Sequence, residues 1–258
     1  MNISRRKFLS LAGSAAALGL AGKGAFEVIA KDQAHKTSVG STHAGKRWAM
    51  VIDLKKFNEN SGMINKCIEA CHLSHNVPKI DNPKTEIKWM WTEPYKHAFV
   101  EQENFNLPWK TQQMPVLLMC NHCDSPPCTN VCPTKATWKR EDGVVMMDWH
   151  RCIGCRYCMA ACPYGSRSFN WVDPRGHLKK TTAEFPTRMK GVVEKCTFCD
   201  ERIAKGLKPA CVAVCENDEM IFGDLHDANS EVRKVLAENF SIRRKPELST
   251  HPEVYYLI

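Results

Sequence analysis

The sequence contains no long hydrophobic run beyond its first thirty residues. A membrane-spanning helix needs about 20 predominantly apolar residues, and the longest later candidate, Met114 to Met119, has six. The earlier stretch from Leu11 to Gly22 is too short and too rich in glycine to be a good span. We therefore expect any link to a membrane to come through a partner.

Signatures of a catalytic site are also missing. The sequence has no phosphate-binding glycine loop, no cofactor fingerprint and no paired nucleophile and base. The formal net charge is +8, but Lys and Arg are scattered rather than gathered in blocks. These observations disfavour an enzyme with its own active site and a protein that binds nucleic acid.

Cysteine, in contrast, is several-fold more frequent than in an average protein, with 14 in 258 residues. Ten of them lie in three runs, Cys120-x2-Cys123-x4-Cys128-x3-Cys132, Cys152-x2-Cys155-x2-Cys158-x3-Cys162 and Cys196-x2-Cys199. The second run, followed by Pro163, matches the bacterial ferredoxin pattern, in which three cysteines ligate one [4Fe-4S] cluster and the fourth reaches a neighbouring cluster. Structural zinc and disulfides are the alternatives, although neither needs a run that ends in proline.

The amino terminus reads as a targeting signal. Ser4-Arg5-Arg6-Lys7-Phe8-Leu9, followed by an Ala/Gly/Leu stretch, predicts a twin-arginine signal peptide over residues 1–30. Cleavage is expected after Ala30, with an uncleaved anchor as the alternative. This route exports folded proteins, which suits a protein that must receive clusters before export, and it predicts a periplasmic location. The polar residues 31–47 are predicted to be a linker.

The two central runs form an internal repeat that indicates the fold. Between them Thr137–Arg140 and Val144–Asp148 flank Glu141-Asp142-Gly143, which predicts a β-hairpin. A strand is expected at Trp48–Asp53. We predict an α+β fold of two interleaved bacterial-type 2[4Fe-4S] ferredoxin-like units over residues 48–223, with the inner pair at 115–172.

Residues 224–258 are predicted to form a C-terminal helix and an extended tail. Ser230 can cap a helix with one apolar face, formed by Val232, Val235, Leu236 and Phe240. The tail Pro252–Ile258 is expected to dock on this protein or on a partner.

For the histidine and the aromatic residues near the cysteine runs, we expect structural roles rather than metal binding or partner docking. His122 is expected to bond to the backbone rather than to metal, and the aromatic residues Trp89, Trp91, Tyr95 and Trp109 to pack rather than to form a docking face. Six basic residues among the runs could offset the charge of anionic clusters, although most are expected to be solvated. They are Lys135, Lys139, Arg140, Arg151, Arg156 and Lys195.

Four cysteine groups after a twin-arginine signal resemble the iron-sulfur electron-transfer subunits of the dimethyl sulfoxide reductase and nitrite-reductase-associated family. The likeness covers nearly the whole sequence from Trp48. Three segments resemble more narrowly the DsrO type, the periplasmic iron-sulfur subunit of the sulfite-reduction-associated Dsr membrane complex. They are Ala70–Pro78, Met147–Arg151 and Tyr164–Trp171.

The resemblance implies three ligand sets, because in this family each cluster takes three thiolates from one group and the last from a partner group. The first set is Cys120, Cys123, Cys128 and Cys162. The second set is Cys152, Cys155, Cys158 and Cys132. The third set is Cys196, Cys199, Cys211 and Cys71.

The first cysteine group departs from the family pattern, since the positions three and six residues before Cys67 hold Ile64 and Ser61. Only Cys67 and Cys215 remain for a fourth cluster, so we predict three [4Fe-4S] clusters, with four as the alternative. Substitute ligands are conceivable at Asp53, Asn65, His72 and His75. A disulfide between Cys67 and Cys215 is a further hypothesis.

The resemblance implies a redox role within a membrane-bound complex. The expected partners are a multi-span quinone-interacting membrane protein of the NrfD/DsrP type, a multihaem cytochrome c, and cytochrome b and heterodisulfide-reductase-like subunits. The protein would relay electrons between the quinone site or the cytochrome c and the rest of a complex for dissimilatory sulfite or sulfur metabolism. The corresponding subunit of a nitrite, polysulfide or dimethyl sulfoxide reductase is one alternative, and a non-redox scaffold held by zinc or disulfides is another.

Overall fold

The computed structural model describes residues 45–102, 104 and 106–258, which belong to one compact unit. The predicted signal peptide and most of the predicted linker lie outside the described residues. Arg47, the last residue of that linker, already contacts the fold, because its backbone N–H donates to Asp224 over 2.7 Å and its side chain to Glu253 over 2.9 Å. No helix among the described residues is long and apolar enough to cross a membrane.

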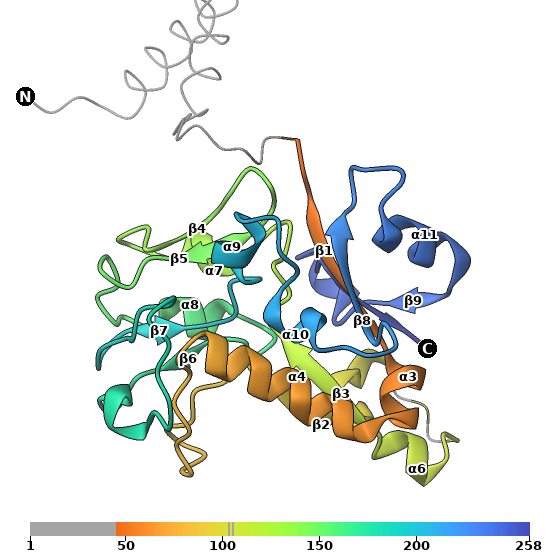
Figure 1. Ribbon diagram of the computed structural model, residues 1–258, viewed down its shortest axis with the longest axis horizontal. Coiled ribbons are helices and arrows are strands. Elements are labelled where there is room, and N and C mark those ends of the chain that lie inside the picture. The colour runs from red at the N-terminus through yellow and green to blue at the C-terminus, as the bar shows by residue number, and fades with distance from the viewer. Residues whose placement is uncertain (1–44, 103, 105) are drawn as a thin grey trace, which may run out of the picture. The chain divides into compact units, whose positions relative to one another are not determined.

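The described residues form short strands and mostly short helices, the longest helix being α4 with 14 residues (Figure 1). The strands are β1 (Trp48–Asp53), β2 (Met90–Pro94), β3 (Pro115–Met119), β4 (Thr137–Lys139), β5 (Val145–Met147), β6 (Ser168–Phe169), β7 (Val193–Glu194), β8 (Met220–Asp224), β9 (Ser241–Ile242) and β10 (Val254–Leu257). The helices are α3 (Leu54–Glu59), α4 (Ser61–Ser74), α5 (Tyr95–Ala98), α6 (Trp109–Gln112), α7 (Pro127–Asn130), α8 (Tyr157–Ala161), α9 (Asp200–Ile203), α10 (Ala210–Ala213) and α11 (Glu231–Glu238). Single 3-10 turns are η1 (Val100–Gln102), η2 (Pro174–His177) and η3 (Pro246–Leu248). This mixed content fits the predicted α+β, ferredoxin-like class.

A four-stranded sheet in the order β8-β1-β10-β9 joins the beginning of the described residues to their end. Its central strand β1 confirms the strand predicted at Trp48–Asp53, and it runs parallel to β10 and antiparallel to β8. The predicted extended tail therefore docks on this protein's own sheet. The same sheet contains β8 and β10, so it draws strands from both sides of the boundary predicted at residue 223.

The two faces of β1 bury different apolar clusters, as the alternation of a strand requires. Met50 and Ile52 face the main core with Phe57 and Tyr256. Ala49 and Val51 face a smaller cluster that includes Val232 of α11. Helix α11 thus covers one face of the sheet.

The structure confirms the cap predicted for α11 and corrects its apolar face. The Ser230 side chain accepts a hydrogen bond from the backbone N–H of Arg233. Phe240, however, is 73% exposed and does not belong to the buried face. The helix ends at Glu238, because Asn239 adopts an extended conformation with φ −125° and ψ 149° and leads into β9.

The other strands form two-stranded sheets, β2-β3, β4-β5 and β6-β7. The β4-β5 pair confirms the predicted hairpin, and Gly143 in its turn has a φ of +85°. Strand β3 ends one residue before Cys120, β5 ends shortly before Cys152, and β7 ends shortly before Cys196. Each cysteine run therefore begins where a paired strand holds the backbone in place.

Replacing the capping residue Ser230 with alanine should loosen α11, since losing a serine cap costs about 1 kcal/mol. We expect roughly fivefold faster hydrogen exchange at the amides of α11, with β1 unchanged. Asn229→Ala is a matched control, because the exposed Asn229 side chain makes no hydrogen bond with the described residues. Equal exchange in the two variants would contradict the capping role.

Candidate metal centres

The first predicted ligand set surrounds one cavity although its members come from two runs. Cys120, Cys123, Cys128 and Cys162 line a space of about 320 Å³, including the part open to solvent. Cys128 lies on α7, where Pro127 occupies the first turn and its missing N–H is no loss. Cys162 follows directly after α8 in an extended conformation, so the backbone reaches across to the loop of the other run.

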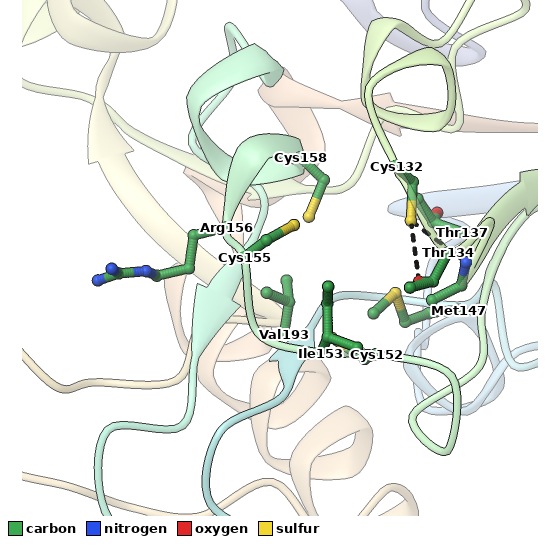
Figure 2. A pocket seen from close by; sticks show the side chains of 11 residues that line it. Cys132, Thr134, Thr137, Met147, Cys152, Ile153, Cys155, Arg156, Cys158 and Val193 are labelled. Carbon is green, nitrogen blue, oxygen red and sulfur yellow. Dashed lines mark hydrogen bonds between the residues drawn. The ribbon is translucent and has the colours of Figure 1, made fainter.

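The second predicted set shows the reciprocal arrangement. Cys132, from the first run, lines a cavity of about 290 Å³, including the part open to solvent, together with Cys152, Cys155 and Cys158. In Figure 2, Cys132 lies across the cavity from Cys155 and Cys158, and the Arg156 side chain points away.

A glycine shapes the loop of this second set. Gly154 has a φ of +71°, and a Cβ built there would lie 2.4 Å from the carbonyl oxygen of Gly191. Only glycine combines this conformation with so close an approach of two backbones. The loop that carries Cys152, Cys155 and Cys158 is therefore held tightly against the segment before β7.

The third predicted set is the most deeply buried. Cys71 lies on α4, Cys196 follows β7, Cys199 precedes α9 and Cys211 lies on α10, and each is at most 4% exposed. Burial raises the pKa of the Cys71 thiol, and the negative charges of Cys196, Cys211 and Cys199 raise it further. The four sulfur atoms therefore lie within electrostatic reach of one another.

The first and third sets are neighbours. Burial and the charge of Cys120 raise the pKa of Cys196 to about 12. Burial and the charge of Cys120 likewise raise the pKa of Cys123 to about 12. Thiolates crowded in this way repel one another unless a cation holds them, and a coordinating metal ion deprotonates such thiols.

The surroundings of the sulfur atoms fit an iron-sulfur cluster. Backbone N–H groups donate to three of them, from Ala136 to Cys132 over 3.2 Å, from Phe198 to Cys196 over 3.4 Å and from Ala210 to Cys199 over 3.3 Å. Hydrogen bonds to the sulfurs are one of the levers by which proteins set cluster potentials. Four-thiol sets with such hydrogen bonds fit [4Fe-4S] clusters.

The leftover cysteines lie together beside the third set, because the Cys215 thiol donates to the Cys211 carbonyl oxygen over 3.4 Å. The Sγ atoms of Cys67 and Cys215 are 3.7 Å apart, and both residues are free thiols. Their hydrogen bond raises the pKa of Cys67 and lowers that of Cys215. Ile64, which stands where a complete group would carry a cysteine, is buried in the main apolar core.

The conceivable substitute ligands have other roles. Asp53 accepts a hydrogen bond from the Lys56 backbone and caps α3. His75 contacts the Cys71 carbonyl oxygen at 2.7 Å and Glu201 at 3.1 Å, which takes up both ring nitrogens. Asn65 and His72 line a different cavity, whose lining contains no cysteine among the described residues.

His122 bonds to the backbone, as predicted. Its Nδ1 accepts from the Val145 N–H over 3.1 Å, and its ring stacks on Phe198 with centroids 3.7 Å apart. Of the aromatic set, Trp89 and Trp91 are buried in the core, whereas Trp109 is 68% exposed.

Sequence reasoning did not single out Arg167. Its side chain is buried, and Nη2 lies 3.0 Å from the Cys128 sulfur. Its only signal was a position within Tyr164–Trp171, directly after the second cysteine run.

Comparison with known proteins supports this view of the sites. Residues 113–225 match the family described as 4Fe-4S dicluster domain. The sequence is 39% identical over 275 residues to the Hdr-like menaquinol oxidoreductase iron-sulfur subunit 1 of Archaeoglobus fulgidus, a match that covers 98% of this sequence and 97% of that protein. It is 35% identical over 237 residues to the menaquinone reductase iron-sulfur cluster-binding subunit of Nitratidesulfovibrio vulgaris, covering 82% and 88%. It is 36% identical over 242 residues to the arsenate respiratory reductase iron-sulfur subunit ArrB of a Shewanella species, covering 82% and 96%.

The protein therefore belongs to the family of iron-sulfur subunits of oxidoreductase complexes, which carry [4Fe-4S] clusters and transport electrons. The broad family predicted from the cysteine groups is confirmed.

The contact between Cys67 and Cys215 predicts that this pair forms a disulfide on oxidation, because a small movement of two sulfur atoms in contact can reach bonding distance. After cluster removal and mild oxidation, we expect mass spectrometry to find the two peptides joined. Cys67→Ser should leave Cys215 open to alkylation. Alkylation of both thiols in the oxidised wild-type protein would contradict the prediction.

Proposed function

We propose that this protein binds three [4Fe-4S] clusters and relays single electrons through them within a membrane-bound redox complex. The observation that carries the proposal is the exchange of Cys162 and Cys132 between two cavities. Loops that trade ligands must hold their clusters close together. Each cluster would supply a one-electron redox couple. The protein would fix the distances between the clusters, their burial and the hydrogen bonds to their sulfur ligands.

Three clusters, rather than four, are favoured by what surrounds Cys67 and Cys215. The two thiols contact each other, and apolar side chains pack around the helix that carries Cys67. A fourth cluster would need two more ligands and space at the same place. The side chains conceivable as substitutes contact other groups or line a different cavity.

The proposed partners follow from the relatives and from the sequence. The names of two relatives specify menaquinol or menaquinone as the redox substrate of their complexes. A quinone-interacting membrane subunit of the NrfD/DsrP type is therefore the favoured partner, with a multihaem cytochrome c, cytochrome b and heterodisulfide-reductase-like subunits. The segments resembling DsrO favour a complex for dissimilatory sulfite or sulfur metabolism. The twin-arginine motif supports a periplasmic location on the outer face of the membrane.

A second candidate is the corresponding subunit of another respiratory reductase. The sequence is 42% identical over 137 residues to one subunit of the polysulfide reductase of Wolinella succinogenes, a match that covers 53% of this sequence and 63% of that subunit. The fuller coverage by the menaquinol oxidoreductase subunit favours the first candidate.

Iron and acid-labile sulfide should each be present at about twelve atoms per protein molecule isolated without oxygen, since each cube holds four of each. The protein should be brown and should bleach on reduction with dithionite. About sixteen irons would overturn the number of clusters. A colourless protein that contains zinc would overturn the redox role in favour of a scaffold.

Removing the crossing ligand Cys162 should disturb the cluster held mainly by the other run. The Cys162→Ser protein is expected to lose up to about four irons, or to keep this cluster with a weaker ligand at the iron that Cys162 binds. The other two clusters should remain. Iron analysis with electron paramagnetic resonance of the reduced protein would measure this. Cys215→Ser is the matched control and should keep the wild-type iron content. A larger loss from Cys215→Ser than from Cys162→Ser would contradict the ligand assignment.

A further inference from the structure

Arg167 lies between the first and second ligand sets. Its Nη2 donates to the Cys128 sulfur over 3.0 Å and to the Thr137 hydroxyl over 2.9 Å. Cys128 lines the cavity of the first set, and Thr137 lines that of the second. Burial lowers the pKa of Arg167, but the charges of Cys128 and Cys158, one from each set, outweigh it and raise this pKa.

Lys195 holds the equivalent place between the first and third sets. Its ammonium group donates to the carbonyl oxygen of Val145, which lines the first cavity, and to that of Cys196, over 2.8 Å for the latter. The side chain is fully buried. Lys195 directly precedes the predicted ligand Cys196 in the sequence.

Neither cation has an acidic partner among the described residues. No carboxylate in residues 45–102, 104 and 106–258 forms an ion pair with Arg167 or Lys195. By contrast, the buried Arg188 pairs with the buried Glu194 at 2.7 Å. A buried charge without compensation is strongly unfavourable. The Cys128 sulfur contacts Arg167 directly, and the Lys195 ammonium group donates to the carbonyl oxygen of the predicted ligand Cys196.

We propose that Arg167 and Lys195 are the counter-charges of the cluster series, and that together they make the first set the centre that holds an electron most strongly. The inference rests on the proposed function, because it requires clusters in the three sets. Each cation lies beside two sets, and only the first set lies beside both. The order along the series of centres is second, first, third.

The physical reason is electrostatic. Adding an electron to an anionic cluster becomes easier when a cation lies nearby, and the effect is large where water is excluded. Arg167 should raise the potentials of the first and second centres, and Lys195 those of the first and third. The first centre then receives both contributions, and an electron entering at either end would settle there before moving on.

The experiment is a redox titration of the isolated full-length protein, followed by electron paramagnetic resonance and visible absorbance, with iron counted in every variant. Arg167→Gln should make reduction of two centres at least about tenfold less favourable, which for one electron is about 59 mV. Lys195→Gln should do the same to two centres. One centre, the one with the highest potential in the wild-type protein, should be affected by both changes.

The control variants distinguish the effect of losing a charge from the effect of a disturbed structure. The iron content of the wild-type protein tests the proposed function separately. Arg167→Lys and Lys195→Arg keep the charge and should restore potentials near those of the wild type. Arg233→Gln removes a charge from the exposed Arg233 of α11 and should leave all three potentials unchanged. Unchanged potentials in both glutamine variants at full iron content, or shifts in which no centre is shared, would overturn the inference. A wild-type protein without iron would instead overturn the proposed function.

Discussion

The structure depends on the need of crowded, buried thiols for a cationic partner. Twelve cysteines form three groups of four, and most of these sulfurs are buried among apolar side chains. Burial and the neighbouring sulfurs raise the pKa values of Cys71, Cys123 and Cys196, so these thiols keep their protons unless a cation compensates the thiolate charge. If clusters occupy the proposed sets, they would tie distant segments together. The free energy of binding them would then add to the stability of a fold whose strands have only two to six residues.

The ligand exchange also explains the order of the elements. Cys132 and Cys162 each follow a short helix and line the cavity of the other run, so each of these two cavities draws cysteines from both runs. The hairpin β4-β5 sets the distance between the runs, and Lys195 and Arg167 fill the polar space between the sets. The four-stranded sheet lies outside this region, and β10 joins it to the carboxyl end of the protein.

Local features of this fold were predictable, and long-range ones were not. The strand Trp48–Asp53, the hairpin around Gly143 and the cap at Ser230 depend on neighbouring residues, so the pattern of the sequence indicated them. The pairing of β10 with β1 joins Val254 to Met50, far apart in the sequence, and no local pattern specifies it. Phe240 fitted a helical period, but the helix ended before it. The sequence offered no local pattern that marks Arg167 beyond its place in the segment Tyr164–Trp171, because its contacts form only when the two cysteine runs fold together.

Burial differs along the three sets, and this difference constrains how electrons can enter and leave. Every thiol of the third set is at most 4% exposed, whereas Cys132, Cys152 and Cys155 of the second set are only partly buried. Ile153, between two of those ligands, is 67% exposed. If clusters occupy the sets, a partner can approach the second set directly, since only a thin layer of loop covers it. Cys71 lies on α4, Cys199 directly precedes α9 and Cys211 lies on α10, so a partner that approaches the third set would pack against these helices.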